Sequence, residues 1–264
     1  TVTGRLSSSK PNLQNFASEI KPLFPCRYDT LINIDAKALE WICAIFLSED
    51  TVGRKEIIFG EDIHSNNQTT FKLPSRLIAK KYLFRMIFGG TAYAYAHDPV
   101  FTSVSTKESY WQNVIDETYR KYQGLHRWHI KLVQEVVNTG CLTMLTGRQY
   151  KYEKIVGEDF PKTKILNYPV QGLGADLLSI IRVSLVRRMK KQGLNSLLIC
   201  TVHDSILIDA FNNEVDIICQ LAYDVFRDLP LNFKRVFGVT LNLPLRCEIQ
   251  TGPTWGTMEI NNAH

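Results

Sequence analysis

The sequence predicts an α+β fold, because a short strand near its start is followed by a long helical block and then by strands that alternate with helices. Three patterns support this order. Residues 30–35 form an apolar run of strand length, residues 75–89 and 107–139 carry apolar side chains at helical spacing, and residues 197–209 have the pattern of two strands around a turn.

The N-terminal part contains a loop, a strand and the start of a helix. Residues 1–25 are rich in Ser, Asn, Gln and Pro, which favour loops with short turns. The strand over 30–35 ends at Asp35, and apolar residues then recur at helical spacing, at Leu39, Ile42, Cys43 and Phe46. Residues 49–70 are polar without a clear period, and we expect irregular structure there.

The central block is expected to be helical. In the helix over 75–89, Ser75 is placed to cap the N-terminus and Gly89-Gly90 to end the helix. Residues 107–139 carry a long helical pattern that includes Trp111.

The C-terminal part returns to mixed structure. The expected elements are a hairpin over 143–152 turning at Thr146-Gly147, a helix over 173–191, a β-hairpin over 197–209 with His203-Asp204 at its turn, a helix over 214–227 and a strand-like run over 243–250.

Composition sets limits on the class of protein. The chain has 264 residues, of which 45% are hydrophobic and 22% charged, enough for one large domain or two small ones. A net charge of +5 is compatible with a polyanionic partner. The six cysteines lack C-x-x-C spacing, so we expect a reducing compartment with neither disulfides nor zinc. We see no apolar stretch of transmembrane length and no signal peptide, and expect no membrane association.

Two carboxylates stand at the ends of apolar strands. Asp35 follows the run 31–34, and Asp204 lies between two further apolar runs. A carboxylate in such a place is costly unless it binds a cation, so the pair predicts a shared centre of two divalent ions, the apparatus for phosphoryl transfer. Taken singly, Asp35 could instead cap a helix and Asp204 could be a turn residue.

Cations and aromatic residues alternate with a spacing of four along the helix over 75–89. Arg76, Lys80, Phe84 and Phe88 would form one slanted row, since each step of four rotates by about 40° and rises by about 6 Å. Cations near a helix N-terminus favour phosphate, and the aromatic rings could stack on a base and sugar. The alternative is an amphipathic helix with solvated cations and core aromatic residues.

In these motifs the chain resembles family A (Pol I-like) DNA polymerases. The row over 76–88 is similar to the family motif R-x3-K-x3-F-x3-Y-G, and residues 3–15 resemble the signature T-G-R-L-S-S-x-x-P-N-L-Q-N. Residues 35–40 resemble D-Y-S-Q-I-E, and residues 202–205 resemble V-H-D-E. Further matches lie at 62–64, 146–148, 167–176 and 244–255, and all of them follow the family's order through the chain.

The resemblance implies a polymerase palm, with an antiparallel sheet, formed by residues 1–48 and 165–264, and helical fingers inserted as residues 49–164. The family's thumb, and its 3′–5′ exonuclease domain where present, come before this signature. Because Thr1 lies just before a motif, we expect this chain to be part of a longer or a split polymerase that acts with such a region on the same or a separate chain.

The resemblance also implies roles for individual residues. Asp35 and Asp204 would hold two Mg²⁺ ions, with Mn²⁺ as a substitute. The incoming dNTP would be bound by His64, Arg76, Lys80, Phe84 and Phe88, with Glu40 as a steric gate against a ribose 2′-hydroxyl. Arg5, Asn167 and Gln171 would contact the minor groove of primer–template DNA, because donors there can test pair shape without reading sequence. His203 would contact the primer terminus, and Arg148 would contact template phosphate. Alternatively, Asn167 and Gln171 could form a turn and cap the helix that begins at Leu173. The implied location is the cytoplasm of a bacterial or phage-infected cell.

Some positions depart from the family pattern. Ser205 stands where Glu is common, which removes a second carboxylate, Phe88 replaces the usual Tyr, and Arg85 replaces a usual Gly. A single-subunit RNA polymerase of the phage type is an alternative, since its motif commonly reads H-D-S, as here. A non-catalytic DNA-binding subunit with the same fold is another.

Overall fold

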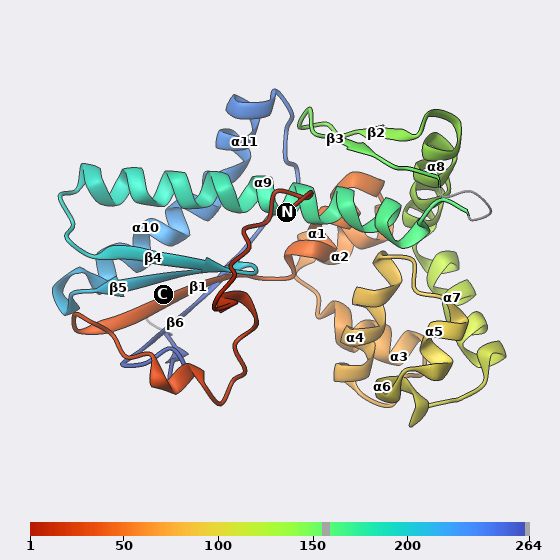
Figure 1. Ribbon diagram of the computed structural model, residues 1–264, viewed down its shortest axis with the longest axis horizontal. Helices are drawn as coiled ribbons and strands as arrows, with labels where there is room; N and C mark the ends of the chain where they lie inside the picture. Colours follow the sequence, from red (N-terminus) through yellow and green to blue (C-terminus); the bar gives the residue numbers. More distant parts are fainter. Residues whose placement is uncertain (155–158, 262–264) are drawn as a thin grey trace. The chain divides into compact units, whose positions relative to one another are not determined.

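The computed structural model describes residues 1–154 and 159–261. The chain divides into two compact units, one formed by Thr1–Leu39 with Gly174–His264 and the other by Glu40–Leu173. Figure 1 follows the chain through them. These divisions lie nine residues from the expected palm and fingers boundaries, and the assignment of the units to palm and fingers stays a prediction.

The first unit is built on an antiparallel sheet with the strand order β4-β5-β1-β6-β7. Its strands are β1 (Thr30–Ala36), β4 (Leu197–Val202), β5 (Ser205–Ala210), β6 (Cys247–Gly252) and β7 (Glu259–Ile260). The expected strand at 30–35 and hairpin at 197–209 are confirmed, and the final strand begins four residues later than expected. β1, near the N-terminus, thus lies between β5 and β6, which come from the C-terminal part of the chain. The ends of β1 therefore lie beside residues that are distant in the sequence.

Helices complete the first unit. α10 (Val215–Arg227) packs on β6 through apolar residues at helical spacing, Ile218, Leu221, Ala222 and Val225. α11 (Leu229–Phe237) was not expected, although Pro230 stands in its first turn, where the missing N–H of proline costs nothing. Two short 3-10 helices, η1 (Leu13–Asn15) and η2 (Lys21–Leu23), interrupt the N-terminal loop, and η3 (Asn212–Glu214) precedes α10.

The second unit is mostly helical. It contains α1 (Leu39–Ser48, from its second residue), α2 (Thr51–Phe59), α3 (Ile63–Thr70), α4 (Arg76–Ile87), α5 (Ala92–His97), α6 (Pro99–Thr102), α7 (Glu108–Lys121) and α8 (Gln123–Thr139). The expectation of irregular structure over 49–70 was wrong. Asp50 caps α2 and Asp62 caps α3, each accepting two backbone N–H groups, and these caps set the helices where the apolar period is weak.

A buried carboxylate divides the long helical pattern at 107–139 into two helices. Asp50 Oδ2 accepts the N–H groups of Gly124 (2.7 Å) and Leu125 (3.2 Å), so one side chain caps both α2 and α8. The aromatic core nearby joins α4 to α5 and α7 through Tyr82, Tyr95 and Trp111, which are fully buried.

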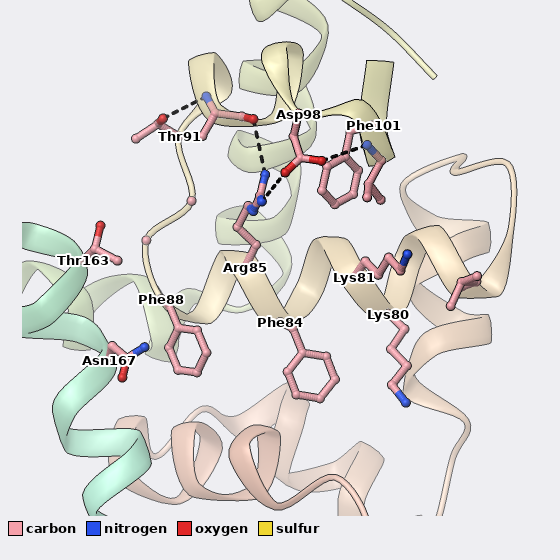
Figure 2. A pocket seen from close by; sticks show the side chains of 15 residues that line it. Lys80, Lys81, Phe84, Arg85, Phe88, Thr91, Asp98, Phe101, Thr163 and Asn167 are labelled. Atoms are coloured by element: carbon pink, nitrogen blue, oxygen red, sulfur yellow. Dashed lines mark hydrogen bonds and ion pairs between the residues drawn. The ribbon is translucent and has the colours of Figure 1, made fainter. Parts of the chain in front are cut away.

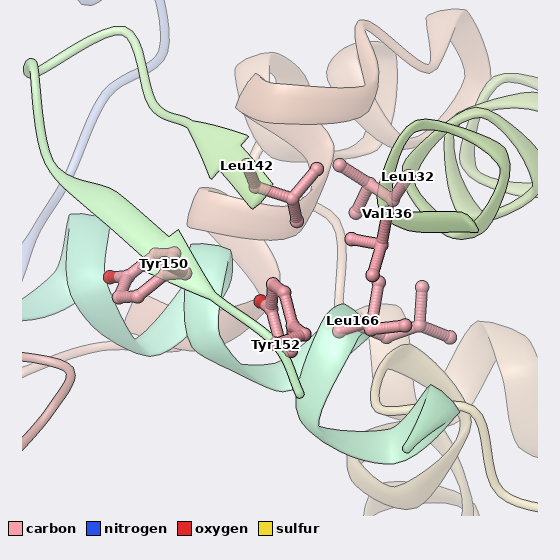
Figure 3. Packing of buried hydrophobic residues seen from close by; sticks show 7 residues of the cluster. Leu132, Val136, Leu142, Tyr150, Tyr152 and Leu166 are labelled. Carbon is pink, nitrogen blue, oxygen red and sulfur yellow. The ribbon is translucent and has the colours of Figure 1, made fainter. Parts of the chain in front are cut away.

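A second cluster of the same unit supports the start of the longest helix (Figure 3). The hairpin of β2 (Cys141–Thr143) and β3 (Gln149–Lys151) confirms the expected turn. Its Leu142, Tyr150 and Tyr152 pack with Leu132, Val136, Ile165 and Leu166. α9 (Lys162–Lys191) therefore begins eleven residues before the expected position, because this packing holds its first turns in place despite the internal Pro169.

By length and composition, α9 is the one helix among the described residues that could cross a membrane. The expectation that no apolar stretch has transmembrane length was therefore wrong. About half of the apolar window (56%) is buried within the structure, as in the core helix of a folded domain.

Gly172 allows a close approach between α9 and β3. A Cβ added there would clash with the Tyr150 hydroxyl oxygen, and the Tyr150 ring is buried. We expect Gly172→Ala to lower the free energy of unfolding by about 1–3 kcal/mol, measured by urea denaturation.

The double variant Gly172→Ala/Tyr150→Phe is the control for this prediction. Removing the hydroxyl oxygen should recover most of the loss, because the next ring atom is 3.1 Å away. Additive effects of the two substitutions would contradict the clash.

Candidate functional site

Strand pairing brings Asp35 beside Asp204. In the β1–β5 ladder Asp35 is directly opposite Ser205, and the Ala36 N–H donates to the Asp204 carbonyl oxygen at 3.1 Å. Residues directly opposite in an antiparallel pair have Cα atoms about 4.5–5.5 Å apart. Two aspartates that are distant in the sequence therefore lie on adjoining backbone at one end of the sheet.

A further carboxylate flanks Asp35 on its other side. Glu248 of β6 is directly opposite Asp35, and its carboxylate forms an ion pair of 3.2 Å with Lys37. Directly opposite residues share a face of the sheet, so Ser205, Asp35 and Glu248 form a row. Sequence reasoning missed Glu248, since the strand-like run over 243–250 gives no register against β1.

Arg5 places its guanidinium on Asp204. The Arg5 Nη2 lies 3.2 Å from Asp204 Oδ1, and each side chain is about one-fifth exposed. Asp204 therefore already holds a cation, which fits the sequence argument that this carboxylate requires one.

The turn between β4 and β5 carries His203 and Asp204, as expected. His203 has a positive φ of 50°, and its side chain is exposed. The side chain of Gln14, from η1, contacts the backbone on this turn: Nε2 donates to the Thr201 carbonyl and Oε1 accepts the His203 N–H, both at 2.9 Å. The sequence analysis gave Gln14 no role, although it lies inside a motif.

In the second unit, α4 presents the expected row of cations and aromatic residues. Ser75 caps the helix by accepting the Ile78 N–H. The buried face consists of Ala79, Tyr82, Leu83, Met86 and Ile87, whereas Arg76 and Lys80 are exposed and Phe84 and Phe88 are half-buried. The aromatic residues of the row are therefore not core residues.

Figure 2 shows this face of α4 from close by. Lys80, Phe84 and Phe88 line a cavity of about 870 Å³, together with Asn167 from α9. Arg85 also lines this cavity but points away from Phe84 and Phe88: it pairs with Asp98, donates to the Ala94 carbonyl (3.3 Å) and lies over the Phe101 ring. This departure from the family pattern thus ties α4 to α5 and α6.

Arg76, the first residue of the row, forms an ion pair with Asp62. Asp62 accepts two hydrogen bonds from Arg76, at 2.8 and 3.1 Å, and this pairing holds the pKa of Asp62 well below its usual range and raises the pKa of Arg76. Arg76 is thus held in place beside the N-terminus of α3.

His64 lies against the same group of cations. Burial, and then the charges of Arg76 and Lys80, lower the pKa of His64 to about 4, so this ring is neutral at pH 7. Its centroid is 6.2 Å from that of Phe84, and Lys80 Nζ lies 5.9 Å from the Phe84 centroid. The histidine, the cations and the aromatic row form one cationic face suited to a polyanion.

The remaining expected site residues also belong to the second unit. Asn167 and Gln171 lie inside α9, one turn apart on one face, so the alternative of helix capping was wrong for both. The Arg148 side chain lies beside Gly172 of the same helix. Glu40 lies in the first turn of α1.

The structure groups the expected site residues by unit. The first unit brings together Arg5, Asp35, His203 and Asp204. The second holds Glu40, His64, Arg76, Lys80, Phe84, Phe88, Arg148, Asn167 and Gln171.

Comparison with known proteins gives a consistent result. The family model described as DNA polymerase family A matches residues 1–257. Proteins named DNA polymerase I from Geobacillus stearothermophilus and Bacillus caldotenax are 26% and 27% identical over 97% of this chain, which spans 30% of their length. A solved structure described as the POL domain of Pol1 from M. smegmatis, in complex with DNA primer-template and dNTP, has the same fold, with a TM-score of 0.84 at 21% identity. That match covers all of this chain and 47% of the other.

Proposed function

Because this chain belongs to DNA polymerase family A, we propose that it forms the nucleotidyl-transfer part of a polymerase that adds dNMP to a primer 3′-hydroxyl as a template directs. The observation that carries this proposal is the pairing of β1 with β5, which sets Asp35 beside Asp204 at one end of the sheet. In this proposal the sheet unit is the palm, the helical unit is the fingers, and a thumb or exonuclease region acts with them on the same or a separate chain.

The residues at the end of the sheet fit divalent ions. Asp35 and Asp204 offer hard carboxylate oxygens, and Asp204 already attracts the Arg5 cation. Within the described residues no group of three or more His, Cys, Asp or Glu side chains is arranged for a metal. Two carboxylates suffice for Mg²⁺, which usually keeps waters and substrate phosphates as its other ligands. Held by these residues, two such ions would supply Lewis-acid chemistry that lowers the pKa of the primer hydroxyl and neutralises charge on the triphosphate.

Other residues would position the two substrates. Lys80 and Arg76 would bind the triphosphate at the α4 N-terminus, with His64 beside them, and the Phe84 and Phe88 rings would face the base and sugar. Glu40 would occupy the space of a ribose 2′-hydroxyl.

The DNA would be held by the remaining donors. Arg5, Asn167, Gln171 and His203 would donate to groups at the primer–template end, and Arg148 would contact template phosphate. Arg5 would have to leave Asp204 to do so, and a metal ion at Asp204 would replace its charge.

Primer extension tests this proposal. The polymerase containing this chain is expected to extend a DNA primer on a DNA template with dNTPs in the presence of Mg²⁺ or Mn²⁺. Preference for NTPs would favour the RNA polymerase alternative, which the H-D-S motif supports. Binding of DNA without extension would favour a non-catalytic subunit.

His64 gives a separate prediction for the nucleotide site. Triphosphate on the α4 cations should raise the pKa of His64 from about 4, because its negative charge offsets the Arg76 and Lys80 charges that now disfavour the imidazolium. NMR titration of the His64 ring with and without a dNTP measures this shift. The His126 resonance, from a ring stacked on Tyr119, is the control. An unchanged His64 titration under saturating nucleotide would place the triphosphate elsewhere.

A further inference from the structure

The turn that carries Asp204 has a left-handed backbone conformation at its first residue, His203. His203 has a φ of 50°, in the left-handed region that residues with a Cβ rarely adopt. Such conformations persist where neighbouring structure fixes them. The β4–β5 ladder ends with the pair Val202 and Ser205, so His203 is the first of two turn residues, the position at which a two-residue hairpin requires a positive φ.

Gln14 adds a second restraint to this turn. Its single amide group spans the turn, donating to the Thr201 carbonyl and accepting the His203 N–H, both at 2.9 Å. These two backbone groups stand on either side of Val202. The Gln14 amide therefore ties the end of β4 to the backbone of the turn residue that precedes Asp204.

The backbone around Gln14 is held by hydrogen bonds to nearby side chains. Asn12 Oδ1 accepts the Gln14 N–H at 3.2 Å, and Ser8 Oγ accepts the Leu13 N–H at 2.8 Å. The amide therefore projects from a 3-10 turn that has hydrogen bonds of its own.

We propose that Gln14 is a positioning residue: its amide locks the His203 backbone and so holds the Asp204 carboxylate where it can share a divalent ion with Asp35. This inference rests on the proposed function, because it assigns Gln14 a role in that same site. The lock is distinct from the Arg5 contact, which is made to the Asp204 side chain and would be displaced by a metal ion.

Mn²⁺ binding to the full chain tests the lock without turnover. Electron paramagnetic resonance of free Mn²⁺ should show about tenfold weaker binding in Gln14→Met, which keeps the side-chain length and loses both hydrogen bonds. Gln14→Asn, with a shorter amide that cannot span the two groups, should show the same loss. The control is Asn15→Ala, which removes a neighbouring exposed amide. All three variants should retain the parent's melting temperature within a few degrees.

Three outcomes decide the matter. Weaker Mn²⁺ binding, with faster hydrogen exchange at the His203 amide, supports the lock. Faster exchange with unchanged Mn²⁺ affinity, or no change in either, overturns it. Asp204→Asn separates the two levels of inference: if that variant binds Mn²⁺ like the parent, the proposed function fails at its metal site. Loss of binding in Asp204→Asn but not in Gln14→Met means that the positioning role alone fails. In primer extension, Gln14→Met should lower kcat and leave the KM for dNTP unchanged.

Discussion

Primer extension is expected to fall by at least about a thousandfold in Asp35→Asn and in Asp204→Asn, which corresponds to about 4 kcal/mol of lost transition-state stabilisation. Each substitution keeps the side-chain volume and removes one negative charge from the end of the sheet, where β1 and β5 set the two residues on adjoining backbone. The double variant should be little worse than either single variant, because both carboxylates serve the same ions. Steady-state extension of a labelled primer measures the three rates.

Glu259→Gln is the matched control for these variants. Glu259 is an exposed carboxylate on β7 of the same sheet, and its loss should leave extension unchanged. Circular dichroism should show that all variants are folded. Extension by Asp35→Asn at a rate close to the parent's would exclude the metal-centred proposal and favour a DNA-binding subunit.

The sequence predicted those helices and strands whose formation depends on residues close to them in the chain. The hairpin around His203 and the capped helix after Ser75 were recognised because apolar runs, a cap and a turn all agreed. The helices over 51–59 and 63–70 were missed, since their apolar faces are short and their start depends on Asp50 and Asp62 as caps.

Long-range packing explains the other errors. The first turns of α9 are held by the hairpin cluster of Tyr150 and Tyr152, which no local pattern around Pro169 could reveal. The same holds at the site. The position of Asp35 and Asp204 at the ends of apolar runs suggested that they act together. The place of Glu248 beside Asp35 depends on strand register. The Gln14 contacts depend on an N-terminal loop that reaches the distant turn at His203.

Loss of the Lys80 ammonium is expected to raise the KM for dNTP by about 10- to 100-fold in Lys80→Ala, because a charge-assisted hydrogen bond to phosphate is worth about 1.5–3 kcal/mol. Among the residues that the structure describes, Lys80 forms no ion pair, whereas Arg76 is held by two hydrogen bonds to Asp62. Lys80 therefore meets the triphosphate without first breaking an ion pair. Titration of dNTP in single-nucleotide extension measures the change.

Lys81→Ala is the comparison variant, because Lys81 is the adjacent exposed lysine and lines the same cavity, but its side chain points away from that of Lys80 in Figure 2. It should change the KM by less than about threefold, the scale of a screened surface charge.

Asp62→Asn is a further test of the two cations of the row, Arg76 and Lys80. Removing the Asp62 charge releases Arg76 for phosphate, so the KM for dNTP should fall in that variant and rise again when Arg76→Ala is added. Equal effects of Lys80→Ala and Lys81→Ala would mean that the total positive charge of α4 attracts the triphosphate. The row of Arg76, Lys80, Phe84 and Phe88 would then have no specific role in binding it.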